Sequence, residues 1–231
     1  MTTSTQSSVR WDDLALQLRA ARIAADTGDS RAHGDLMTVF ASIEERYAAA
    51  DEALEDGSTE PLQRLQMEAL EVKGRLHTRG ELVDLFAAID AFKGSASIAQ
   101  SLGLMENWAL RTMDWTRLQI MRDPKHPDAE QAFVDGSHAA AYFERHWRDE
   151  EAGRYGKMMA AMGGYLYAHG YFRIGRQKIK YGKKFLKGVH EKKQYRADLI
   201  GMYRLAGQRT RARLLRPLFA VTDIVGEIWF A

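Results

Sequence analysis

Apolar side chains recur along this chain at intervals of three and four residues instead of two, which predicts α-helices and almost no strands. The clearest run steps by four and three and consists of Leu36, Phe40, Ile43, Tyr47, Ala50 and Leu54. A second run begins near Pro61 and consists of Leu62, Leu65, Ala69, Val72 and Leu76. Two such helices joined by a short turn predict an antiparallel pair. We favour a core within the chain, and the alternative is a heptad seam that recruits a second chain.

Further helical segments lie on both sides of this pair. We expect a first helix from Ser8 to Thr27, a fourth segment that ends at Gly94, and a fifth from Ser97 to Met121. The segment Arg122–Pro127 contains two prolines, which interrupt helices, so it is the expected subdomain boundary. The pattern therefore predicts an all-α protein with a helical bundle over residues 1–121 and a second helical part over residues 128–231.

Five small residues follow this break at a strict spacing of four: Ala152, Gly156, Ala160, Gly164 and Ala168. On a helix they form a stripe that lets another backbone approach closely. Because glycine inside a helix costs about 1 kcal/mol relative to alanine, the stripe needs a compensating contact. We favour a contact inside this chain, and the alternative is a partner subunit.

The longest stretch without a formal charge, Met158–Phe172, overlaps this stripe and has 15 residues. A bilayer span needs about 20 residues, so we expect a buried helix and no transmembrane segment, with a membrane-surface helix as the alternative. The first ten residues are polar, which argues against a secretory signal and makes the cytoplasm the expected location.

The composition is that of a globular protein of one or two domains, with 231 residues, 45% hydrophobic and 28% charged side chains. This excludes a disordered or collagen-like chain. The absence of cysteine excludes a disulfide framework, thiolate metal sites and a cysteine nucleophile.

Charge is distributed very unevenly along the chain. Residues 1–172 carry 18 basic and 27 acidic side chains, whereas residues 173–216 carry 15 basic and two acidic ones. The tail, residues 217–231, is apolar, and we expect it to dock in the core or on a neighbour. The N-terminal bundle is thus acidic, and the C-terminal helical part contains a strongly basic segment.

The basic segment, residues 173–216, is the candidate nucleic-acid interface, because flexible cations on a helix bind phosphates without reading sequence. The candidate binding residues are Arg173, Arg176, Lys178, Lys180, Lys183, Lys184, Lys187, Lys192, Lys193, Arg196, Arg209 and Arg213. Aromatic residues between them are either core residues or platforms for unpaired bases, namely Tyr181, Phe185, Tyr195 and Tyr203. The alternatives for the charges are a solvated face, docking on the chain's own acidic half, and an anionic membrane surface.

Catalytic motifs are missing from the sequence. There is no phosphate-binding loop, no His-Glu-x-x-His and no Gly-x-Ser-x-Gly. The nearest fragment of a metal or enzyme site is Asp135, His138 and His146, which fall roughly along one helix face. Hydrogen-bonding histidines near a helix start explain it more simply. We therefore expect no enzymatic activity, no metal and no cofactor.

In helicity, size and the basic segment Arg173–Arg216, the chain resembles the all-helical small subunits of CRISPR-type ribonucleoprotein complexes. It is somewhat longer than they are and has no diagnostic motif. The resemblance implies a non-catalytic subunit of an antiviral assembly. It would bind the backbone of RNA or single-stranded DNA, with RNA favoured, and contact neighbouring subunits through the heptad and small-residue faces. The alternatives are a scaffold protein, such as a virion component or membrane-surface adaptor, and a helical-bundle enzyme with a pocket near Asp135, His138 and His146.

Overall fold

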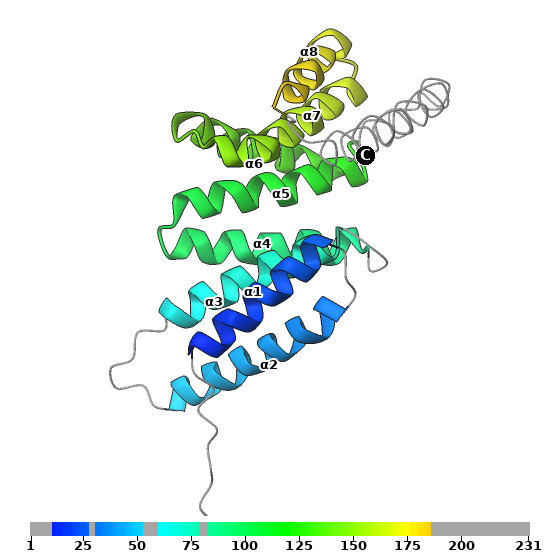
Figure 1. The fold of residues 1–231 in the computed structure, drawn as a ribbon. Helices are drawn as coiled ribbons and strands as arrows, with labels where there is room; N and C mark the ends of the chain where they lie inside the picture. Colours follow the sequence, from blue (N-terminus) through cyan, green and yellow to red (C-terminus); the bar gives the residue numbers. More distant parts are fainter. Residues whose placement is uncertain (1–10, 28–30, 53–59, 79–82, 186–231) are drawn as a thin grey trace, which may run out of the picture. The chain divides into compact units, whose positions relative to one another are not determined.

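The computed structural model describes residues 11–27, 31–52, 60–78 and 83–185, and every regular element in these ranges is helical (Figure 1). The helices are α1 (Trp11–Thr27), α2 (Arg31–Glu52), α3 (Glu60–Leu76), α4 (Leu85–Ser101), α5 (Met105–Arg122), α6 (Pro127–Arg145), the 3-10 turn η2 (Asp149–Glu151), α7 (Ala152–Ala168) and α8 (Phe172–Lys183). The all-α prediction is confirmed. The chain forms two compact units, which divide between Leu104 and Met105.

The first unit has its core between α1, α2 and α3. The side chains that share this core are Leu14, Leu18, Ala21, Leu36, Val39, Ile43, Leu65, Ala69, Val72 and Leu76. The predicted apolar run of α3 is therefore buried in full, together with Leu62. On α2 the buried row includes Val39, while Phe40 lies at the edge of the core with the Lys73 ammonium 5.6 Å from its ring centroid. Of the predicted seam, Leu36, Phe40 and Ile43 pack against helices of the same chain. The side chains of Tyr47 and Ala50, and all of Leu54, lie outside what the structure describes.

The boundary between the fourth and fifth helices differs from the prediction. Helix α4 continues through Gly94 to Ser101, and the chain turns at Gly103, whose φ of +69° favours glycine. A Cβ atom on Gly94 would lie 3.2 Å from the Leu70 side chain. Gly94 thus gives α3 room to pack against α4, and it does not end the helix.

The second unit is built on α5, α6 and α7, which meet at Gly136. A Cβ atom on Gly136 would collide with the side chains of Met158 on α7 and Thr116 on α5. Because α5 packs against α6 and α7, the expected boundary at Arg122–Pro127 falls inside this unit, as the connection between α5 and α6. There His126 caps α6, accepting a hydrogen bond from the Asp128 N–H, and Pro127 takes the first helical position.

Helix α7 is buried along most of its length, as expected for the uncharged stretch. The residues from Met158 to Gly164 are all buried. Among the residues that the structure describes, no helix is long and apolar enough to cross a membrane.

Helices α7 and α8 touch backbone to backbone at two pairs of glycines. A Cβ atom on Gly175 would lie 2.5 Å from the carbonyl oxygen of Gly163, and one on Gly182 would collide with that of Gly156. Both pairs follow one antiparallel register, since Gly156 and Gly163 are seven residues apart, as are Gly175 and Gly182. Such an approach is open only to residues without a side chain at these points.

Two members of the small-residue stripe, Gly156 and Ala160, are thus covered by α8 of the same chain. A Cβ atom on Gly182 would lie 2.9 Å from the backbone nitrogen of Ala160 and would also meet Gly156, as the intrachain interpretation required. The second close approach uses Gly163, one residue before the predicted Gly164. The stripe therefore pairs with glycines of the basic segment.

We predict that Gly182→Ala destabilises the protein by about 1–3 kcal/mol, because the added methyl group must push α8 away from α7. The matched control is Gly34→Ala in α2, where an added Cβ atom meets nothing within 4 Å. That change should stabilise the protein by up to about 1 kcal/mol. Denaturant unfolding followed by circular dichroism measures both, and a Gly182→Ala variant as stable as the parent would contradict the packing.

Candidate nucleic-acid interface

Helix α8 has one buried and one cationic side. Gly175, Ile179 and Gly182 are buried against α7. Five exposed cations lie around the opposite side: Arg173, Arg176, Lys180 and Lys183, spaced by three and four residues, and Lys184, which directly follows Lys183. None of these five makes an ion pair with any residue that the structure describes. The contact with α7 therefore determines which way the row of cations faces.

Lys178 differs from the other predicted binding residues. Its ammonium group lies 3.7 Å from the Met159 sulfur and it is half-buried on the α7 side. It therefore belongs to the packing between the two helices. The remaining candidates lie outside the described residues, namely Lys187, Lys192, Lys193, Arg196, Arg209 and Arg213, as do Tyr195, Tyr203 and the apolar tail.

The hairpin of α7 and α8 has no acidic side chain of its own. Residues 152–185 contain eight lysines and arginines and no aspartate or glutamate. Arg154 lies 3.2 Å from Glu151 and 3.6 Å from Asp114, outside this range. Within this hairpin, the exposed side of α8 therefore carries formal charges of positive sign only.

An aromatic cluster lies at the C-terminal end of α8. Its centre is the fully buried Tyr155, whose ring centroid lies 5.2 Å from Phe185, 5.5 Å from Trp147 and 6.4 Å from Tyr181. The Phe185 ring in turn lies 5.1 Å from Tyr181 and 5.3 Å from Trp147. Phe143 packs on Tyr155 from α6, at 5.7 Å.

Two rings of this cluster reach the surface. Tyr181 is 43% exposed and Trp147 is 40% exposed, whereas Phe185 is half-buried. Of the interleaved aromatics, Phe185 thus packs largely as a core residue, and Tyr181 is shared between core and surface. Trp147 was missed by the sequence reasoning, because it lies in the connection between α6 and α7 and follows no helical period with Tyr181.

The hydroxyl of Tyr155 donates a hydrogen bond to the Glu144 carboxylate. Burial, and secondly this carboxylate, raise the pKa of Tyr155 well above its ordinary value. Burial also raises the pKa of Tyr165, with Glu130 and Tyr171 adding to the effect. Both tyrosines are therefore neutral at physiological pH.

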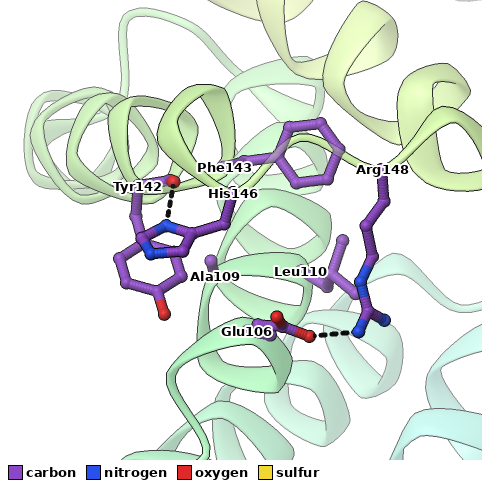
Figure 2. A pocket seen from close by; sticks show the side chains of 7 residues that line it. All are labelled: Glu106, Ala109, Leu110, Tyr142, Phe143, His146 and Arg148. Atoms are coloured by element: carbon purple, nitrogen blue, oxygen red, sulfur yellow. Dashed lines mark hydrogen bonds and ion pairs between the residues drawn. The ribbon is translucent and has the colours of Figure 1, made fainter.

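The fragment Asp135, His138 and His146 does not form a common site. Asp135 accepts a hydrogen bond from Gln131 at 2.8 Å, and His138 is exposed. Only His146 of the three lines the hollow drawn in Figure 2. Among the residues that the structure describes, no group of three His, Asp or Glu side chains is placed to hold a metal ion.

The hollow itself has a volume of about 220 Å³, including space open to solvent. Its lining is Glu106, Ala109, Leu110, Tyr142, Phe143, His146 and Arg148. As Figure 2 shows, the Arg148 guanidinium pairs with Glu106 at 2.6 Å, and His146 Nδ1 lies 3.0 Å from the Tyr142 carbonyl oxygen. Arg148 and Glu106 are thus paired within the lining of the hollow, and one ring nitrogen of His146 is paired with the backbone of Tyr142.

We predict that the free energy of unfolding falls above pH 10 and falls less steeply in Tyr155→Phe. The unfolded chain releases the proton near the ordinary pKa of 10.0, while the folded protein keeps it. The unfolded state then binds fewer protons, so stability decreases as pH rises, by at most about 1.4 kcal/mol per pH unit. Denaturant titrations of parent and variant at several pH values measure this. If the two curves of unfolding free energy against pH were parallel, the prediction would be contradicted.

Comparison with protein-family models, with curated proteins and with solved structures finds no match to this chain.

Proposed function

We propose that helix α8 binds the sugar–phosphate backbone of a nucleic acid, with little preference for base sequence. The observation that supports this most is the row of five exposed cations, from Arg173 to Lys184, without ion pairs to described residues. Side chains of this kind neutralise phosphates and release bound counterions, which drives sequence-independent binding. The resemblance to CRISPR small subunits favours RNA within a larger assembly.

The row is long enough to meet several nucleotides of one strand. Arg173 and Lys184 are 11 residues apart, so the row is about 16 Å long at about 1.5 Å per helical residue. At about 3.4 Å per nucleotide along the axis of a stacked, helical strand, roughly five phosphates fall within this length. Cations at three- and four-residue steps can therefore meet successive phosphates of one strand.

The packing of α8 against α7 favours binding to a phosphate backbone over binding to a bilayer. A helix that lies in a membrane surface inserts a broad apolar face. The corresponding face of α8, with Gly175, Ile179 and Gly182, is packed against α7. One observation favours a membrane surface instead: three apolar residues at the start of α8 are exposed, namely Tyr171, Phe172 and Ile174.

We predict that affinity for single-stranded homopolymers falls with salt, with a slope of log affinity against log salt of about −3.5 if the five α8 cations meet phosphates. Changing Arg176, Lys180 and Lys183 to Glu should flatten the slope by about 2, since each lost contact removes about 0.7. The free energy of unfolding should change by less than about 0.5 kcal/mol, because these side chains are exposed and unpaired.

The matched control carries the same change of net charge elsewhere. Arg19, Lys125 and Arg145 are exposed, and their replacement by Glu should leave the salt slope unchanged. If both triple variants lost the same affinity, the effect would come from net charge alone, and a binding site on α8 would be contradicted. Binding to anionic vesicles with no binding to homopolymers would favour the membrane-surface adaptor.

A further inference from the structure

We infer that the ligand of α8 is single-stranded, and that an unpaired base stacks on the surface formed by Trp147 and Tyr181. The inference rests on the proposed function and adds to it the class of nucleic acid and a residue from outside the basic segment. It is based on the aromatic cluster, in which rings from α8 pack together with Trp147 from the connection between α6 and α7.

The two exposed rings are held in place by the rings beneath them. Tyr155, fully buried, contacts both, and Phe185 lies within 5.3 Å of Trp147 and 5.1 Å of Tyr181, measured between ring centroids. The indole N–H of Trp147 donates to the Asp149 carboxylate at 2.9 Å, which fixes the ring orientation. Rings fixed in this way lose little conformational freedom when a base stacks on them.

Charge differs on the two sides of this surface. Tyr181 is flanked by exposed Lys180 and Lys183. Trp147 is followed by Arg148, whose charge is paired with Glu106, and then by the exposed acids Asp149 and Glu150. Phosphates are attracted to the lysine side and repelled from the acidic side, while a neutral base is tolerated on both. The layout therefore directs the backbone along α8 and the base toward Trp147.

A duplex has no unpaired base that could stack on this surface, except at its ends. Its bases are paired and stacked on one another, so their faces are covered except at the ends. Stacking on aromatic side chains is a property of single strands, and removing one such ring lowers affinity by about five- to a hundredfold. The α8 cations alone would bind a duplex and a single strand alike.

The test uses the full chain and three labelled probes of equal length, measured by fluorescence anisotropy at low salt. The probes are an oligothymidylate, an abasic strand with the same phosphates, and a duplex. We expect the oligothymidylate to bind at least about fivefold more tightly than the abasic strand. Equal affinities would overturn the stacking while leaving the phosphate contacts intact.

Variants at Tyr181 then locate the surface. Tyr181→Ala should lose about five- to a hundredfold in affinity for the oligothymidylate and nothing for the abasic strand, and Tyr181→Phe should bind like the parent. Ile174→Ala is the matched control, since Ile174 lies seven residues earlier on α8 and is 53% exposed. Trp147→Ala is expected to behave as Tyr181→Ala does.

The outcomes separate this inference from the proposed function. If the parent binds none of the probes, the proposed function fails and the inference with it. If all three bind and Tyr181→Ala is unchanged, the cations bind phosphate and the stacking is wrong. If the duplex binds as tightly as the oligothymidylate, the single-strand assignment is overturned.

Discussion

The direct contact between the backbones of α7 and α8 is the constraint on which the candidate interface depends. At Gly163 with Gly175, and at Gly156 with Gly182, neither helix has a side chain to hold the other away. Helix α8 alone is short and highly cationic, and a segment of this kind has little intrinsic helical stability in water. Packing on α7 supplies the missing stabilisation, and it turns the cations outward.

The aromatic cluster depends on the same contact. Tyr155 lies on α7, and Tyr181 and Phe185 lie at the end of α8, so their rings meet only if the glycine pairs hold the helices close. Phe143 and Trp147 complete the cluster from α6 and from the connection after it. Three parts of the second unit therefore converge where α8 carries its last lysines.

Much of this fold could be predicted from periodicity, because a helix must bury one face and the spacing of apolar residues reveals that face. The buried row of α3 and the small residues of α7 are examples. Glycine was harder to interpret. Gly94 and Gly103 look alike in the sequence, but the first makes room for Leu70 and the second turns the chain at positive φ. Only the partner helix distinguishes these roles.

The candidate site could be predicted less completely than the fold. Its cations were identified because charge is a property of the sequence itself, but Lys178 turns toward Met159, and the row faces outward only because α7 covers the other side. Trp147 could not be predicted from the sequence, because its position beside Phe185 results from tertiary packing. Periodicity predicts which residues share a helix face and not which helices meet.

Lysine modification with and without a single-stranded oligonucleotide tests the central claim most directly. An amine-specific reagent, read by mass spectrometry, reports each lysine separately in the intact protein. The account predicts that Lys180, Lys183 and Lys184 become protected by the oligonucleotide, while the exposed Lys93 and Lys125 react as before. Unchanged modification of the three α8 lysines, with the oligonucleotide bound, would contradict it.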